Sequence, residues 1–305
     1  MKRSQAQDWL AYIGLRILIA SIQAASLETC QRVVRVLAFW LSRTIPLRRA
    51  TIDENLRMVI PGITPKQLTD MRYAMWEHLL LMVCEIAHAP RKIHRTNWRD
   101  HFYLPNKNEM LRTLMGARPT ILVTGHFGNF ELAGFATGLF GIPSTTIARP
   151  LDNPYVHDYV TQFRSLGGQH MLDKEGSAVP VQEILQSGGT LALLADQHAG
   201  AKGCWTDFLG HPASCHKALA LFVLTSGASM VVAYNRRLQR SLMFELGMTG
   251  LTHPDTAGEH MASVKTLTAW YNQRLEQAIR MAPQQYWWVH RRWRDAPPKR
   301  KAAAA

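Results

Sequence analysis

The stretch 121–131, Ile-Leu-Val-Thr-Gly-His-Phe-Gly-Asn-Phe-Glu, contains two residues suited to acid–base chemistry, His126 and Glu131. A carboxylate bonded to one imidazole nitrogen fixes the tautomer and raises the basicity of the other nitrogen, which can then take a proton. No Ser or Cys lies between Gly125 and Glu131. The pattern therefore favours a base that activates a substrate hydroxyl over a covalent nucleophile. The alternative is structural, with the histidine capping a helix and the glutamate in its first turn.

Other polar residues follow or lie close to predicted strands. Arg149 ends one predicted strand, and Asp196 and Gln197 follow another, at the same edge of the sheet as the histidine. An arginine there could bind a phosphate or stabilise an oxyanion, or could simply pair with Asp152. The carboxylate and the amide could orient an acceptor hydroxyl or hold the following loop. Arg164, on the next predicted helix, is equally compatible with an ordinary surface arginine.

The elements that must position these residues alternate between strand and helix from Pro119 onward. The predicted fold is therefore α/β, with a central, mostly parallel or mixed sheet flanked by helices. Predicted strands cover 120–124, 144–148, 190–194, 229–234 and 242–246. Predicted helices cover 130–139, 154–166, 178–186, 217–226 and 262–282.

The N-terminal part is predicted to be helical and to associate with a membrane. Helices at about 9–25 and 27–41 are apolar over most of their surface, and arginines and aromatic residues accompany the second. The first is marginal as a membrane span. We expect 1–45 to form anchoring or interfacial helices, 46–296 the catalytic domain and 297–305 a flexible tail. Two ordinary core helices are the alternative. The cations expected to contact anionic lipid are Lys2, Arg3, Arg43, Arg48 and Arg49.

Two further helices precede the α/β region, at about 48–58 and 65–88. The second has methionines at helical spacing, which indicates core packing or the wall of a hydrocarbon tunnel. At the other end, 285–294 mixes Trp with Arg. This composition suits a membrane interface and equally suits single-stranded RNA, although no recognisable nucleic-acid-binding motif accompanies it.

Composition limits the class of protein. The chain has 305 residues, 47% of them hydrophobic, and a formal net charge of +13, which implies an anionic partner. Four scattered cysteines suggest a reducing compartment. Five potential metal ligands cluster in sequence, but their spacing matches no usual zinc pattern, so we expect no metal; they are His198, Cys204, His211, Cys215 and His216.

Taken together, several ordered blocks resemble the lipid A biosynthesis acyltransferase family, the lauroyl/myristoyl transferases of the lysophospholipid acyltransferase-like superfamily. The first is the His-x-x-x-x-Glu block formed by His126 and Glu131. Phe130 departs from the family pattern, in which Trp is common at that position, and 208–215 also departs locally, which leaves chain length and acceptor open. The other blocks are Asn55-Leu56, 149–154, Arg164 with Gly167-Gly168, 195–197, 207–210 and 288–293.

The resemblance implies a glycerol-phosphate-acyltransferase-like fold and a membrane-associated O-acyltransferase. Its catalytic residues would be His126 and Glu131, and its substrate-binding residues Arg149, Arg164, Asp196 and Gln197. It would move an acyl chain from acyl carrier protein or acyl-coenzyme A to a hydroxyl of a lipid A precursor, at the cytoplasmic face of the cell inner membrane. No cofactor and no nucleic acid would be required. A lysophospholipid or mannosylated glycolipid as acceptor, or a non-enzymatic membrane- or RNA-binding protein, are the alternatives.

Overall fold

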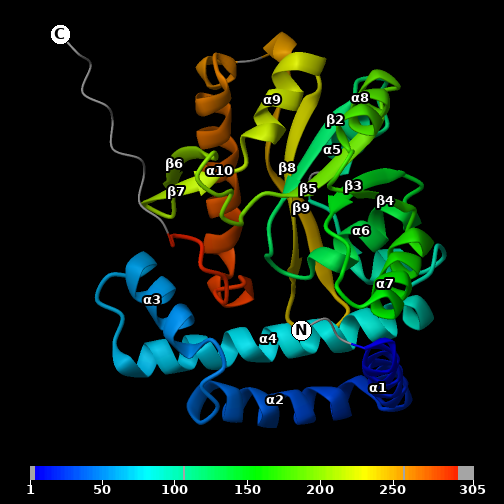
Figure 1. Cartoon of the computed structure of the whole chain (residues 1–305), viewed down its shortest axis with the longest axis vertical. Coiled ribbons are helices and arrows are strands. Elements are labelled where there is room, and N and C mark those ends of the chain that lie inside the picture. Colours follow the sequence, from blue (N-terminus) through cyan, green and yellow to red (C-terminus); the bar gives the residue numbers. More distant parts are fainter. Residues whose placement is uncertain (1–3, 106, 257, 295–305) are drawn as a thin grey trace.

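The computed structural model describes residues 4–105, 107–256 and 258–294 and is built around one seven-stranded sheet (Figure 1). The strand order is β1-β9-β8-β2-β5-β3-β4, and every neighbouring pair is parallel except β8 and β9. This confirms the expected mostly parallel α/β sheet flanked by helices. The strands are β1 (Phe102–Tyr103), β2 (Thr120–Thr124), β3 (Ser144–Ala148), β4 (Gln169–Asp173), β5 (Thr190–Leu194), β8 (Ser229–Arg237) and β9 (Phe244–Thr252).

Helices cover both faces of the sheet. The α-helices after β1 are α5 (Lys107–Leu114), α6 (Phe130–Leu139), α7 (Pro154–Leu166), α8 (Ala178–Gln186), α9 (Lys217–Ser226) and α10 (Val264–Met281). Helix α6 packs on one face together with α7, whereas α9 and α10 pack together on the other. A separate antiparallel hairpin, β6 (Cys204–Phe208) and β7 (His211–Cys215), lies beside α10 (Figure 1).

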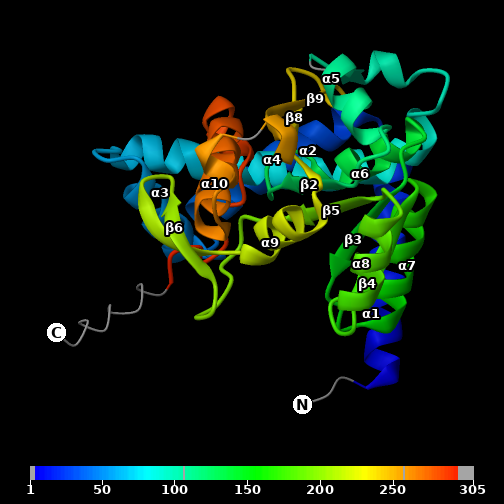
Figure 2. The same cartoon turned by 90° about the horizontal axis from the view of Figure 1, so that it is seen from above.

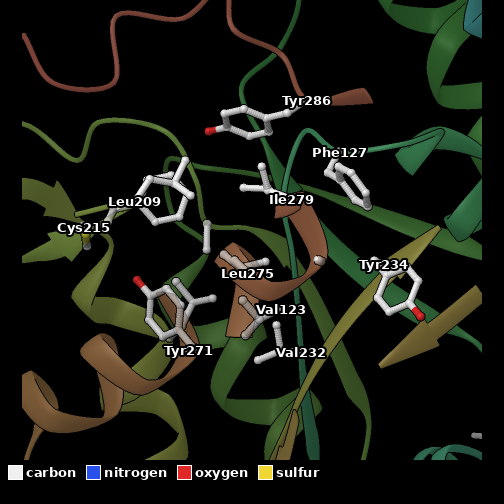
Figure 3. Packing of buried hydrophobic residues seen from close by; sticks show 14 of the residues in the cluster. Val123, Phe127, Leu209, Cys215, Val232, Tyr234, Tyr271, Leu275, Ile279 and Tyr286 are labelled. Carbon is white, nitrogen blue, oxygen red and sulfur yellow. The ribbon is translucent and has the colours of Figure 1, made fainter. Parts of the chain in front are cut away.

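The main core lies between the sheet and α10. Figure 3 shows Val123 of β2 and Val232 of β8 facing Tyr271, Leu275 and Ile279 of α10. All five side chains are buried. This core fixes β2, the strand that leads into the candidate catalytic histidine.

The N-terminal helices form a layer below the sheet: α1 (Gln5–Ala24), α2 (Leu27–Arg43), α3 (Arg49–Val59) and α4 (Pro65–Lys92). Helix α2 packs along α4, while α1 contacts α4 and α7 and lies beside α7 in Figure 2. Only one face of α2 is buried, through Cys30, Val34 and Ala38. Within the described residues, no helix has the length and apolar composition needed to cross a membrane.

Most predicted elements agree with the structure. The sequence analysis did not predict β1, α5, β4 or the β6–β7 hairpin. The C-terminal segment 285–294 also differs from its interpretation as an aromatic surface for lipid or RNA, because Trp288 and Arg292 are each only 1% exposed. The tail predicted for 297–305 and the lipid contacts predicted for Lys2 and Arg3 lie outside the described residues.

Candidate active site

The register of two parallel strands brings the candidate base and its carboxylate together. Thr124 at the end of β2 pairs with Leu194 at the end of β5. His126 and Asp196 each follow two residues later, so both leave the same edge of the sheet side by side. Gly125 leaves room for this contact, since a Cβ there would lie 3.1 Å from Cγ of Asp196.

Asp196 holds His126 through two hydrogen bonds. Nδ1 of the imidazole donates to Oδ1 over 2.8 Å, and the backbone N–H of His126 donates to Oδ2 over 2.8 Å. Burial acts to raise the pKa of Asp196, but the charge and hydrogen bonds of His126 outweigh it and lower that pKa to about 2. The carboxylate is therefore charged at neutral pH. Because Nδ1 donates to this carboxylate, Nε2 is the imidazole nitrogen that could accept a proton from a substrate.

Glu131 is not the partner of His126, contrary to the pairing predicted from sequence. Helix α6 begins at Phe130 with Asn129 as its N-cap, whose side chain accepts from the N–H of Leu132. This start turns Glu131 toward α7, where Nε and Nη2 of Arg164 donate to its two carboxylate oxygens over 3.0 and 2.5 Å. A spacing of five residues across a turn does not fix a contact, whereas the register of adjacent strands does.

Four more side chains lie close to the imidazole: Gln197, His290, Trp287 and Phe130. The amide nitrogen of Gln197 lies 3.3 Å from Nε2 of His126 and 3.3 Å from Nε2 of His290. The rings of Trp287 and Phe130 lie with their centroids 5.0 Å from that of His126. Burial, followed by the positive charges of His126 and Arg48, lowers the pKa of His290 to about 4. His290 is therefore neutral at physiological pH.

The sequence analysis missed His290 and Trp287 as site residues. They approach because the C-terminal segment returns to the sheet: the N–H of Trp287 donates to the carbonyl of His126, and that of Gly128 to the carbonyl of Gln285. The side chain of Asn55 then donates to the carbonyls of Trp288 and His290 over 2.8 and 2.7 Å. The sequence pointed to His290 only through block 288–293, one of the segments that resemble the acyltransferase family.

A buried ionic network supports the loop that follows His126. Arg237 forms two hydrogen bonds to Glu85, at 2.6 and 2.7 Å, and Nη1 donates to Nδ1 of His78. His78 then donates from Nε2 to the carbonyl of Gly128, and Asn129 donates to Glu85. Burial and then Arg237 hold the pKa of His78 well below its usual value, so this histidine is neutral. Each polar side chain of the network has a hydrogen-bond partner within it, and this stabilises one conformation of the loop that follows His126.

An apolar pocket lies against the same loop, between α6 and the sheet. It encloses about 970 Å³, its open mouth included. Leu122, Ala192 and Thr146 occupy matched positions on three neighbouring strands and line it together. Phe130, Glu131 and Arg164 also line it. The methionines of α4 do not, so those that are buried are core residues rather than a tunnel wall.

The remaining predicted residues lie elsewhere. Arg149 follows β3 at the expected edge, but its side chain is 83% exposed and its ion-pair partner within the described residues is Asp152, at 3.5 Å. The structure gives it no contact with His126 or Asp196 among the described residues. In that same part of the chain, no group of three or more His, Cys, Asp or Glu side chains is arranged to hold a metal ion.

Fold and site together define a class of protein: an α/β protein with a carboxylate–histidine pair at the carboxyl edge of the parallel strands β2 and β5, beside an apolar pocket. Comparison with known proteins agrees. Residues 1–295 match the family model described as bacterial lipid A biosynthesis acyltransferase. The chain belongs to this family and is an acyltransferase.

Similar proteins include two from Escherichia coli strain K12. The lipid A biosynthesis lauroyltransferase is 24% identical over 296 residues, covering 95% of this chain and 92% of the relative. The lipid A biosynthesis palmitoleoyltransferase is 25% identical over 298 residues, with the same coverage. A lipid A biosynthesis acyltransferase of Haemophilus influenzae is 21% identical over 289 residues, covering 93% of this chain and 87% of the relative.

Proposed function

We propose that this protein transfers a fatty acyl chain from a thioester donor to a hydroxyl of a lipid A precursor, with His126 as general base. The observation that carries the proposal is the His126–Asp196 pair beside the apolar pocket. The family match and the names of the relatives support the acceptor. Acyl carrier protein is the proposed donor, with acyl-coenzyme A as the alternative.

The proposed reaction is a direct transfer. Nε2 of His126 takes the proton of the acceptor hydroxyl as its oxygen attacks the thioester carbon, and the charged Asp196 stabilises the imidazolium that forms. Collapse of the tetrahedral intermediate breaks the carbon–sulfur bond. The thiolate leaves and receives the proton from the imidazolium, so the base is regenerated. All atoms are accounted for without a further reactant.

The apolar pocket is the proposed binding site of the acyl chain. Phe130 touches the imidazole ring and also lines the pocket, so a chain inside it would end close to Nε2. Arg164 lines the pocket too, and its guanidinium N–H groups are donors suited to the thioester carbonyl oxygen as it gains charge. In this proposal Glu131 orients Arg164 rather than His126.

We also propose that the protein works at the cytoplasmic face of the inner membrane, with α1 and α2 in the lipid interface. Outward-facing apolar side chains support this: Trp9, Leu10, Ile17 and Leu18 of α1, then Val33, Val36, Leu37, Phe39 and Trp40 of α2, are 45–63% exposed. Arg43 lies over the ring of Phe39 at 4.4 Å. Apolar area combined with cations suits an interface with anionic lipid.

The test is transfer of radiolabelled acyl chains from acyl carrier protein to a lipid A precursor, by wild type and His126→Ala in detergent. A lysophospholipid is the parallel acceptor. We expect label in the lipid A precursor with wild type, and a loss of about 10²–10⁴-fold in turnover with His126→Ala. Thermal unfolding of both proteins controls for folding.

Each result has a definite meaning. Near wild-type turnover by His126→Ala would exclude it as the base. Preferential labelling of the lysophospholipid would move the proposal to that acceptor class. A folded wild-type protein that labels neither would refute the proposed substrate.

A further inference from the structure

A basic hollow lies beside Gln197 and His290, two of the residues that surround His126. It measures about 620 Å³ with its open side included. Gln197 and His290 belong both to this hollow and to the surroundings of His126, because the amide of Gln197 contacts both imidazoles at 3.3 Å. The hollow is lined by Arg48, Gln197, His198, His290, Arg291 and Arg294.

The charge of the hollow is strongly positive. Its lining contains three arginines and no Asp or Glu among the described residues. Within the same part of the chain, Arg48 and Arg291 have no ion-pair partner, whereas the buried Arg72 and Arg237 are paired with Asp53 and Glu85. Two guanidinium groups, those of Arg48 and Arg291, that line one hollow without an ion-pair partner among the described residues favour an anionic ligand.

The arginines are held on a rigid backbone. Arg291 lies between His290, whose carbonyl accepts from Asn55, and Arg292, which is 1% exposed and donates to Ser214 and Cys215. Arg48 precedes α3 with φ of 54°, a left-handed conformation that is unfavourable for a residue with a side chain. The contacts of His290 and Arg292 therefore fix the backbone of Arg291, and Arg48 leaves the chain at a defined backbone conformation.

We propose that the basic hollow binds a phosphate group of a substrate and so places the acceptor hydroxyl or the thioester next to His126. This inference rests on the proposed function and adds a subsite to it. Phosphate fits because its oxygens accept several guanidinium N–H groups at once. His290, kept neutral by burial and positive neighbours, can supply one more N–H.

Two substrates could supply that phosphate: the lipid acceptor and the phosphopantetheine arm of the donor. The position of the hollow favours the acceptor. The apolar pocket and the hollow share no lining residue, so donor and acceptor could approach His126 from different sides. Arg48 also lies close in sequence to Ile45 and Leu47, two exposed apolar residues that follow helix α2 of the proposed membrane surface.

The test measures binding without catalysis. Wild type in detergent is titrated with a glucosamine disaccharide lipid, with and without its phosphate, in the absence of donor. A second titration compares S-acyl phosphopantetheine with S-acyl pantetheine in the absence of acceptor. The variants are Arg291→Gln and Arg48→Gln, both at exposed positions, and Arg112→Gln of α5 is the control with the same charge change.

Wild type should prefer the phosphorylated form of one substrate by about tenfold or more, since that is the size of a hydrogen-bonded charge contact. Arg291→Gln and Arg48→Gln should each remove most of this preference, and Arg112→Gln should keep it. Loss in the lipid titration identifies the acceptor phosphate, and loss in the thioester titration identifies the donor phosphate. No preference in wild type, or a preference that survives both substitutions in folded proteins, overturns the inference. Because no transfer is measured, failure of the proposed reaction would be seen separately.

Discussion

Asp196→Asn tests whether Asp196, as in the structure, or Glu131, as expected from sequence, is the carboxylate that acts on His126. The substitution keeps the shape of the side chain and removes the charge that faces Nδ1 of His126 at 2.8 Å. The pKa of Asp196 is about 2 against an ordinary 3.8, which corresponds to roughly 2–3 kcal/mol of net stabilisation of its charged form. The same interaction would stabilise the imidazolium that forms during transfer.

If that stabilisation is lost in the transition state, turnover should fall by about 30- to 150-fold. The assay is single-turnover acyl transfer under saturating substrate, measured between pH 5.5 and 8.5. With no carboxylate beside it, the protonated ring is less favourable, so the acidic limb of the rate profile should move to lower pH. A merely structural role for Asp196 would lower the rate without moving this limb.

Glu131→Gln is the control, because it makes the same change of a carboxylate to an amide at a partly buried residue that bonds Arg164 instead. It should lower turnover without moving the acidic limb. The reasoning fails if folded Asp196→Asn keeps both the wild-type rate and profile. It fails equally if Glu131→Gln, rather than Asp196→Asn, shifts the limb.

Three further predictions concern the pocket, the pH dependence of stability and the loop. Ala192→Phe should shorten the preferred acyl chain, because Ala192 lines the pocket between Leu122 and Thr146; competition between donors of different length measures this, and an unchanged preference would exclude the pocket. The free energy of unfolding should fall by about 2 kcal/mol from pH 6.5 to 4, because on acidification His290 binds a proton at higher pH in the unfolded chain than in the folded one. Denaturant titration at each pH measures this, and His290→Gln should show a weaker dependence of unfolding free energy on pH. The same pH dependence in wild type and variant would contradict the prediction. Gly128→Ala should lower the free energy of unfolding by at least about 3 kcal/mol, since the φ of Gly128 is 60° and a Cβ would lie 2.0 Å from the carbonyl oxygen of Asn235. Gly200→Ala is the control, with a positive φ but open space around it, and should lower the same free energy by about 1 kcal/mol. Equal losses for the two variants would refute the predicted clash.

The sheet could be predicted from sequence where local signals agree. Pro119 precedes β2, a short apolar run forms it, and Asn129 caps α6, so both elements match their predicted bounds. The β6–β7 hairpin lacked such a signal. Its turn places Leu209 at φ of 51° before Gly210, and leucine is rare in that conformation. Strand β4 was missed because it is a half-exposed edge strand with no clear alternation.

The site was only partly predictable, because several residues that contact each other in it lie far apart in the sequence. Sequence spacing correctly placed His126, Asp196 and Gln197 at one edge, since the ends of parallel strands meet there. It could not assign the hydrogen-bond partner of His126, because Asp196 is 70 residues away and strand order decides which residues are neighbours. His290 was harder still, because its position depends on Asn55, 235 residues earlier.

The way the C-terminal segment closes the site has a consequence during synthesis of the chain. Strands β2 and β5 and the helix carrying Asn55 leave the ribosome well before residues 285–290, which they later contact. The histidine loop therefore lacks the backbone partners supplied by Gln285 and Trp287 until these residues have been made. Long-range closure of this kind is expected to be late and slow. The surroundings of His126 should therefore form after the strands that carry it.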